Sequence, residues 1–231
     1  MTTQIAGNIA AIKQRINAAA SRCERDPASI QLMAVSKTVE PARIREALEA
    51  GITLFGENYV QEAREKIPAI GQAVSWHMIG HLQTNKVKYV VNLFNWIHSV
   101  DRLELAQELD KRARQNNRKL NVLIEVNVSG ETSKSGAEPS RVLELARQIS
   151  TLPHLQVRGL MTMPPYSDHP ETSRPYFRSL SKLRDEIKAT AISNIRLDDL
   201  SMGMTDDFEV AIEEGATIIR VGRAIFGERI R

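Results

Sequence analysis

Short apolar runs rich in β-branched residues occur eight times along this chain, and this recurrence limits its fold more than any other feature. The runs cover residues 31–36, 52–56, 74–79, 95–100, 121–128, 155–162, 198–202 and 217–222. Helix-patterned segments lie between them at 41–50, 57–70, 83–93, 102–117, 139–151, 172–190 and 206–214, and another covers 4–24. Strands that alternate with helices form parallel βαβ units, and eight units close a barrel. We therefore predict an α/β fold in which residues 1–231 form one (β/α)8 TIM-type barrel domain with an additional N-terminal helix.

Local signals mark the boundaries of the predicted helices. Pro41 and Pro139 fit first-turn positions, where a missing N–H costs nothing. Gly51 and Gly215 follow helical runs and fit C-terminal stops. Three pairs fit an N-cap followed three residues later by Glu or Gln: Asn58 with Gln61, Asp101 with Glu104, and Asp206 with Glu209.

The rival architecture is a doubly wound open sheet. Such sheets usually have fewer strands and carry a glycine fingerprint directly after the first strand. Here the first apolar run is followed by Ser-Lys-Thr-Val-Glu-Pro, and no glycine appears until Gly51. The closed barrel is therefore the better prediction.

Charge and composition exclude several classes of partner. The 31 Lys and Arg residues and 28 Asp and Glu residues are interleaved, so no basic block predicts nucleic-acid binding. No run of 18 consecutive apolar residues predicts a membrane span, and the N-terminal segment does not resemble a signal peptide. A single cysteine, Cys23, is consistent with a reducing cytoplasm. We therefore expect a cytoplasmic protein with neither a nucleic-acid nor a membrane partner.

Lys37 stands at the end of the first apolar run. The carboxyl ends of the strands form the face of such a barrel that carries the chemistry. If Met33 and Val35 point into the barrel, alternation directs Lys37 inward as well. A lysine in a dry site can form a Schiff base with a carbonyl compound. The alternative is a lysine that only reaches from a strand end to solvent.

The loops after the seventh and eighth runs have the chemistry of a phosphate site. Ser201 offers a hydroxyl, Gly203 and Gly222 permit close backbone approach, and helix N-termini follow. Barrels frequently hold phosphate between these two loops, although an ordinary β–α turn is the alternative. Arg220 alternates with apolar neighbours, so it should point inward and meet a ligand or a carboxylate.

One cofactor matches these three groups in kind. Pyridoxal 5′-phosphate (PLP) carries an aldehyde for Lys37, a phosphate for the two loops and a pyridine nitrogen for Arg220. An arginine there would keep the ring nitrogen unprotonated and make the ring a weaker electron sink. We expect no metal, because His77 and His81 are four residues apart but flank a strand running into a loop.

Eight longer motifs support the same interpretation. The segments AVSKT (34–38), FGENYVQE (55–62), WHMIGHLQTNK (76–86), SVDR (99–102), ETSKSG (131–136), RGLMTM (158–163), LSMGMTDD (200–207) and IRVGRAIFG (219–227) resemble the pyridoxal-phosphate homeostasis protein family, also called YggS/PROSC. The resemblance runs from the first strand to the C-terminus. It implies a barrel similar to the N-terminal domain of alanine racemase.

The resemblance also implies roles for particular residues. It implies Lys37 as the Schiff-base lysine and Arg220 near the pyridine nitrogen. Arg223 departs from the many members that have Thr or Ser at this position, so its side-chain contact with phosphate stays open. The remaining implied cofactor-binding residues are Asn58, His81 and Met163 along the pocket, and Ser201, Gly203 and Gly222 at the phosphate.

Two functions are compatible with these residues. The resemblance implies a PLP-binding homeostasis protein without established catalytic activity. Such a protein would buffer or deliver PLP, affect amino-acid and keto-acid pools, make transient contact with PLP-dependent apo-enzymes and be a monomer. The alternative is a PLP-dependent racemase, which needs an acid/base group on each face of its substrate. Tyr59, Tyr89, Tyr166 and Tyr176 offer no obvious second base. A weaker third alternative is a phosphate-binding barrel enzyme without PLP.

Overall fold

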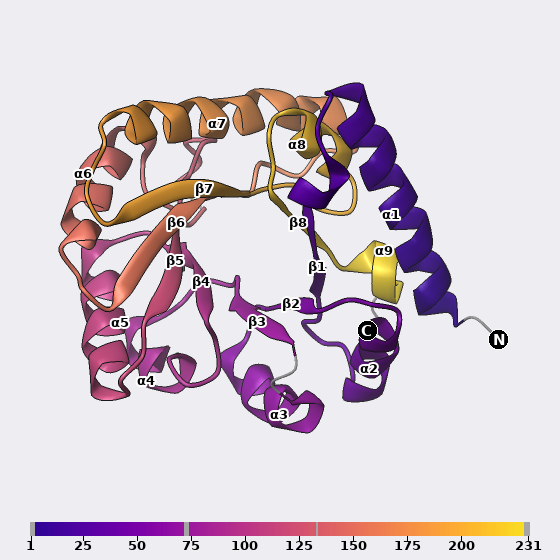
Figure 1. Cartoon of the computed structure of the whole chain (residues 1–231), viewed down its shortest axis with the longest axis horizontal. Coiled ribbons are helices and arrows are strands. Elements are labelled where there is room, and N and C mark those ends of the chain that lie inside the picture. Colours follow the sequence, from indigo (N-terminus) through magenta and orange to yellow (C-terminus); the bar gives the residue numbers. More distant parts are fainter. Residues whose placement is uncertain (1–2, 72–73, 133, 229–231) are drawn as a thin grey trace.

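Eight parallel strands close into a barrel in chain order, as the sequence predicts (Figure 1). The structure is a computed structural model that describes residues 3–71, 74–132 and 134–228. The strands are β1 (Gln31–Val35), β2 (Leu54–Glu57), β3 (Ser75–Met78), β4 (Trp96–Val100), β5 (Leu120–Glu125), β6 (Leu155–Met161), β7 (Ile195–Ser201) and β8 (Ile218–Val221). Closure pairs β1 with β8, where Met33 lies opposite Arg220.

Helices cover the outside of the barrel between successive strands (Figure 1). They are α1 (Gln4–Arg22), α2 (Pro41–Glu49), α3 (Val60–Ile70), α4 (Val87–Val90), α5 (Leu103–Gln115), α6 (Pro139–Ser150), α7 (Arg174–Ala189), α8 (Phe208–Glu213) and α9 (Arg223–Phe226). Short 3-10 helices lie at η1 (Pro27–Ser29), η2 (Thr84–Lys86) and η3 (Pro170–Ser173). The predicted N-terminal helix is α1, which packs against α2, α8 and α9.

Some of the predicted helix boundaries are confirmed and three are wrong. Pro41 and Pro139 begin α2 and α6, and Gly51 and Gly215 follow α2 and α8 with positive φ angles of 88° and 99°. Each of the three predicted N-caps precedes its helix by at least one further residue: α3, α5 and α8 are capped by Tyr59, Arg102 and Asp207. The predicted caps have other contacts instead: Asn58 lines a cavity, Asp101 binds its neighbour Arg102, and Asp206 binds Arg223.

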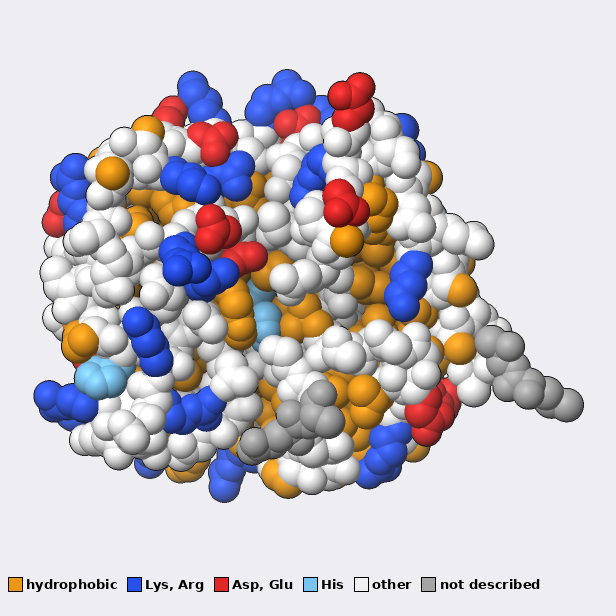
Figure 2. Space-filling model, in the orientation of Figure 1, with side chains coloured by type: hydrophobic (Ala, Val, Ile, Leu, Met, Phe, Trp, Pro, Cys, Tyr) orange, Lys and Arg blue, Asp and Glu red, His pale blue; other side chains and the backbone are white. Residues whose placement is uncertain are grey.

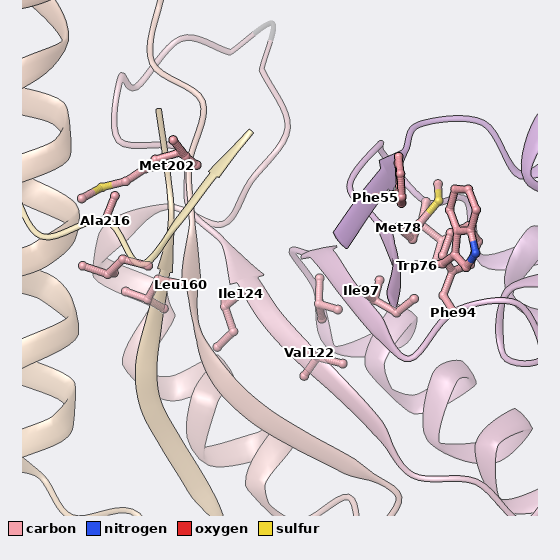
Figure 3. Packing of buried hydrophobic residues seen from close by; sticks show 14 of the residues in the cluster. Phe55, Trp76, Met78, Phe94, Ile97, Val122, Ile124, Leu160, Met202 and Ala216 are labelled. Carbon is pink, nitrogen blue, oxygen red and sulfur yellow. The ribbon is translucent and has the colours of Figure 1, made fainter. Parts of the chain in front are cut away.

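The main core lies between the barrel and its helices. Outward-facing strand side chains such as Phe55, Trp76 and Met78 pack with helix and loop side chains such as Phe94 (Figure 3). Burial of each such side chain contributes roughly 1.5–3 kcal/mol. This layer fixes the alternation of every strand, because the side chains between those of the outer core must face the barrel interior.

The barrel interior contains an apolar cluster and a polar cluster. A small apolar cluster beside β1, β2 and β8 contains Met33, Leu54, Ile79 and Ile218, with Val35 packed against it. This cluster confirms the inward direction predicted for Met33 and Val35. The interior beside β3, β4, β7 and β8 is polar instead, and its buried side chains include His77, His98, Ser201 and Arg220. A hollow is visible at the centre of the molecule, and charges of both signs surround it without forming a single-sign patch (Figure 2).

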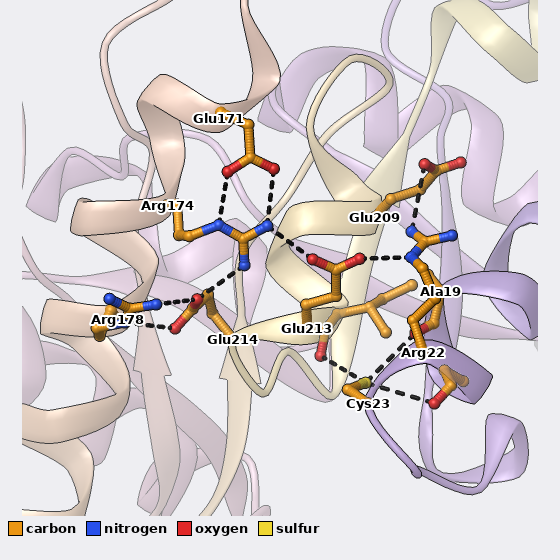
Figure 4. Close-up of polar contacts among 11 residues, drawn as sticks. Ala19, Arg22, Cys23, Glu171, Arg174, Arg178, Glu209, Glu213 and Glu214 are labelled. Carbon is orange, nitrogen blue, oxygen red and sulfur yellow. Dashed lines mark hydrogen bonds and ion pairs between the residues drawn. The ribbon is translucent and has the colours of Figure 1, made fainter.

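Ion pairs hold α1 and α7 against the short helix α8 (Figure 4). Arg174 binds Glu171, Glu213 and Glu214 at 2.6, 2.7 and 2.9 Å. Glu213 also binds Arg22 at the end of α1, at 2.7 Å. Since these groups are partly exposed, each pair contributes only modestly, but the shared carboxylates join three helices at one point.

Two glycines give a matched test of this packing. A Cβ atom on Gly159 of β6 would lie 1.8 Å from the Asp199 carbonyl oxygen of β7, whereas one on Gly7 of α1 would meet nothing within 4 Å. We expect Gly159→Ala to lower the free energy of unfolding by more than about 3 kcal/mol. Gly7→Ala should raise it by roughly 0.5–1 kcal/mol, through helix propensity. Denaturant unfolding of both variants checks this, and equal effects would contradict the packing.

Candidate functional site

The barrel mouth holds a cavity of about 220 Å³ at the carboxyl ends of the strands. Six of the nine predicted site residues line it: Lys37, Asn58, Met163, Arg220, Gly222 and Arg223. Val35, Ile79, Tyr166, Met204, Thr205 and Asp206 complete the wall. A second cavity of about 390 Å³ extends towards α2 and α9 and shares Lys37, Val35, Gly222 and Arg223 with the first. The Lys37 side chain therefore borders both cavities.

The other three predicted residues lie around this cavity rather than in its wall. His81 is exposed, with Nδ1 3.2 Å from the Ser135 hydroxyl. Ser201 is buried beneath it. Gly203 has a φ of 89°, and a Cβ there would lie 2.5 Å from the Ala211 side chain of α8. Close packing against α8 therefore requires a glycine at this position.

The segment that carries Lys37 is anchored by a buried lysine on α3. Lys66 Nζ donates to the Ser36 carbonyl oxygen at 2.7 Å and contacts Glu57 and Glu62 at 3.3 and 2.6 Å. Burial raises the pKa of the Glu57 carboxyl, while Lys66 and Ser36 act in the opposite direction. One cation thus holds two carboxylates and the backbone just before Lys37.

The backbone just after Lys37 is anchored by the same cluster. The Thr38 N–H donates to Glu62 Oε2 at 2.7 Å, and the Ser36 hydroxyl donates to Glu57 Oε1 at 2.7 Å. Thr38 adopts a φ of 61°, in the left-handed region that a β-branched residue rarely occupies. Such a conformation persists only where its surroundings hold it in place. The position of Lys37 is thus set from both sides by α3 and β2.

Arg220 is almost fully buried and points inward, as alternation predicts. Its guanidinium donates to Ser201 Oγ at 2.7 Å and to the Thr162 carbonyl oxygen at 2.9 Å. Burial lowers its pKa to about 10, although Asp207 and Glu125 act in the opposite direction. Among the residues that the structure describes, no carboxylate forms a salt bridge with it, so the alternative of an ion pair inside the barrel is not observed. These bonds use two of its five N–H donors.

Sequence reasoning missed two buried residues beside Arg220. His98 contacts both Ser201 and His77, and it was not selected because its partners come from other strands. The available signal was its position, since His77 and His98 both stand at inward positions of neighbouring strands. Both ring nitrogens of His77 take part in hydrogen bonds, with Ser75 and His98.

Glu125 is the second residue that sequence reasoning missed. It ends β5, is buried, and its Oε2 has no hydrogen-bond partner in the described part of the chain. Burial and the nearby Asp101 raise its pKa to about 7, although Arg220 lowers it. The carboxyl therefore changes its charge near neutral pH, beside the buried guanidinium.

The two predicted phosphate loops meet at the same side of the cavity. Asp207 shapes the first loop by accepting from the Met204 N–H at 2.7 Å and from the Ser173 hydroxyl at 2.9 Å. Gly222 caps α9, the short helix predicted after β8. The Arg223 side chain is partly exposed and bonds Asp206 across the two loops. The contact between Arg223 and a phosphate stays a prediction.

Two features are absent from the described part of the chain: a metal-binding cluster and a membrane-spanning helix. Residues 3–71, 74–132 and 134–228 contain no group of three or more His, Cys, Asp or Glu side chains able to hold a metal ion. Within the same ranges, none of the helices has the length and apolar character needed to cross a membrane.

Known proteins resemble the chain over nearly its whole length. The family described as alanine racemase, N-terminal domain, matches residues 7–230. A pyridoxal phosphate homeostasis protein of Aquifex aeolicus is 50% identical over 94% of this chain and 95% of its own length. PipY of Synechococcus elongatus, solved with PLP bound, has a TM-score of 0.85 and 36% identity, covering 97% of this chain and 100% of PipY.

A more distant structure shows the fold alone. Alanine racemase of Corynebacterium glutamicum has a TM-score of 0.75 at 15% identity, and the match covers 97% of this chain but 61% of the racemase. The chain is thus a (β/α)8 barrel of the alanine racemase N-terminal type, by its fold and by the family that matches it. It belongs to the alanine racemase N-terminal domain family and, within it, to the pyridoxal phosphate homeostasis proteins.

The raised pKa of Glu125 predicts a dependence of stability on pH. Between about pH 4.5 and 7 the folded protein retains a proton that the unfolded chain has released, so this group lowers the free energy of unfolding as pH rises. We expect Glu125→Gln to be more stable than wild type above pH 7, by about 3 kcal/mol, and equally stable below about pH 4. Urea unfolding across pH measures this, with the exposed Glu144→Gln as the control. A difference in the free energy of unfolding between the two proteins that does not change with pH would contradict this prediction.

Proposed function

We propose that the protein binds pyridoxal 5′-phosphate at the barrel mouth and acts in its homeostasis by holding and releasing it. One observation carries this proposal: Lys37 and the buried Arg220 line a single cavity together with both glycine-containing loops. The names of the homologous homeostasis proteins and the PLP bound in PipY support it.

The cavity offers a partner for each functional group of the cofactor. Lys37 provides an amine from β1 for the aldehyde, and we assign the Schiff base to it. Met204, Thr205, Gly222 and Arg223 come from the loops after β7 and β8, where barrels hold phosphate.

The remaining wall residues orient the ring. Bound there, the cofactor supplies an aldehyde carbon and an electron-withdrawing ring. Arg220 would donate an N–H to the ring nitrogen and, as a permanent cation, would disfavour a proton on it. Asn58 and Met163, which line the cavity, would hold the ring together with the exposed His81. An arginine partner makes the ring a weaker electron sink, which favours holding the cofactor over carbanion chemistry.

Removal of the Lys37 amine tests this assignment. Wild-type protein titrated with PLP should develop a visible absorption band, and borohydride should fix the cofactor to Lys37 as a stable adduct found by peptide mass spectrometry. Lys37→Ala should lose the band and the adduct and bind at least about tenfold more weakly. Lys134→Ala is the control, because Lys134 Nζ also reaches the mouth, at 3.5 Å from the Met163 carbonyl oxygen. A wild-type protein that takes up no PLP would refute the proposal.

One observation favours the alternative, a PLP-dependent racemase. Tyr166 lines the same cavity as Lys37, so a second acid/base group is present at the mouth, contrary to the sequence expectation. Its hydroxyl, however, donates to Asp168 at 2.7 Å, and this bond raises the pKa of the phenol. The side chain is also 75% exposed, so it does not exclude water from the site. These properties make Tyr166 a poor base, and we retain the non-catalytic function.

Turnover of amino acids distinguishes the two functions. Holo-protein incubated with L- or D-alanine should interconvert them no faster than free PLP does, as measured by chiral chromatography. Tyr166→Phe should leave this background unchanged. Turnover clearly above free PLP that is lost in Tyr166→Phe would establish the racemase.

The rim of the mouth also suits a protein partner. Among the described residues, the exposed large hydrophobic side chains are Tyr59, Met163 and Tyr166, and two of them line the cavity. Transient docking of PLP-dependent apo-enzymes over this rim is therefore part of the proposal. The monomeric state and the cytoplasmic location stay predictions from the sequence.

A further inference from the structure

A continuous chain of hydrogen-bonding side chains crosses the barrel interior from β3 and β4 to β7 and β8. It starts at Ser75, whose Oγ lies 3.0 Å from His77 Nε2. His77 Nδ1 lies 2.9 Å from His98 Nε2, and His98 Nδ1 lies 3.0 Å from Ser201 Oγ. Arg220 completes the chain by donating to the same oxygen over 2.7 Å. The chain thus connects the beginning of β3 to the cation at the cavity.

The charge state of the chain follows from burial. Burial lowers the pKa of His77 to about 3. Burial, His77 and Arg220 together hold the pKa of His98 well below its usual range. Both rings are therefore neutral at pH 7, and each carries a single N–H. Trp96 stacks on His77 with ring centroids 5.0 Å apart and keeps that ring in place.

The direction of the hydrogen bonds follows from the guanidinium. A guanidinium only donates, so Ser201 Oγ must accept from Arg220. If Ser201 in turn donates to His98 Nδ1, each ring donates from Nε2, and Ser75 accepts the last bond. Ser75 is only half-buried, so its own proton can turn to water.

The reverse direction leaves one buried group without a partner. Ser201 would then accept from both Arg220 and His98, and its own proton would need another acceptor. Within the described ranges, Arg220 and His98 are the only residues that form side-chain hydrogen bonds with this hydroxyl. A buried donor without an acceptor costs about 1–3 kcal/mol. The direction from Arg220 towards Ser75 is therefore the stable one.

This direction makes Ser201 Oγ a fixed acceptor for Arg220. Because His98 Nδ1 accepts the hydrogen bond from the hydroxyl, the lone pairs of Ser201 remain for the guanidinium. The second anchor of Arg220 is the Thr162 carbonyl oxygen, and the Thr162 hydroxyl is itself bonded to the Val126 carbonyl oxygen at 2.8 Å. Two anchors from adjacent strands fix the plane of the guanidinium.

We propose that His98, supported by His77, is a positioning residue for the cofactor: it orients the Ser201 hydroxyl so that Arg220 keeps an N–H directed at the ring nitrogen. The inference rests on the proposed binding of PLP. It gives the Ser201 hydroxyl a place in this chain rather than at the phosphate.

The first experiment needs no cofactor. Nitrogen-15 NMR of the imidazoles in cofactor-free protein, with His77→Phe and His98→Asn to assign the signals, should show both rings protonated at Nε2. Protonation at Nδ1 in either ring means that the chain runs the other way, and the proposal is then wrong.

The second experiment compares two amides at position 98. Asparagine carries its oxygen near the place of Nδ1 and can still accept from Ser201, whereas a glutamine amide lies near Nε2 and contacts only His77. We expect His98→Gln to weaken PLP binding about tenfold and to shift the visible band. His98→Asn should weaken binding less than about threefold. In a Ser201→Ala background, the two substitutions should have equal effects.

Controls separate positioning from general damage. Asp199→Asn changes a buried polar residue two positions before Ser201 and should bind PLP as wild type does. If His98→Gln binds PLP with wild-type affinity and an unchanged band, the proposal fails while the proposed function stands. If wild type binds no PLP, the proposed function fails. If neither His98 variant folds, Ser201→Ala alone must show the tenfold loss and the shifted band, and its absence refutes the role of the chain.

Discussion

A guanidinium enclosed by a barrel is the constraint on which the rest of this interior depends. Removing the charge of Arg220 from water costs several kcal/mol unless its donors find acceptors. Ser201 and the Thr162 carbonyl oxygen provide them, and the same cation helps to keep His98 neutral. These groups come from β4, the end of β6, β7 and β8, so they link distant strands across the interior. Met33, the partner of Arg220 on the neighbouring strand β1, belongs instead to the small apolar cluster beneath the strand end that carries Lys37.

The fold could be predicted from the sequence because strand and helix periodicities are local. Eight apolar runs gave the number and order of strands, and alternation through Met33 and Val35 gave the inward direction of the strand that ends before Lys37. The helix starts could not be predicted from cap signals alone. Asp101 and Asp206 have the chemistry of an N-cap, but arginines bind their carboxylates. The arginine at Asp206 is Arg223 from the next loop, a contact that a local pattern cannot reveal.

Only part of the candidate site could be predicted, because some of its residues depend on contacts with distant strands. Lys37, Arg220 and Gly222 stand at strand ends, a place the fold itself singles out, and they meet in one cavity. Gly203 was predicted to approach a phosphate, and that role stays a prediction; the structure explains the glycine by its close contact with α8. His98 was missed because a buried polar residue acquires its meaning from partners on other strands, and these pairings only exist once the barrel has closed.

The packing of α1 has a consequence for the order in which the protein folds. Ile5, Ile9, Ile12 and Ile16 are buried on a helix that contacts α8 and α9, nearly 200 positions further along the chain. On the ribosome this apolar face is made before α8 and α9, the helices against which it packs. Until α8 and α9 have been made, the apolar face of α1 is exposed to solvent unless α2 or a chaperone covers it. The packing of α1 is therefore complete only when α8 and α9 provide the surface that it covers.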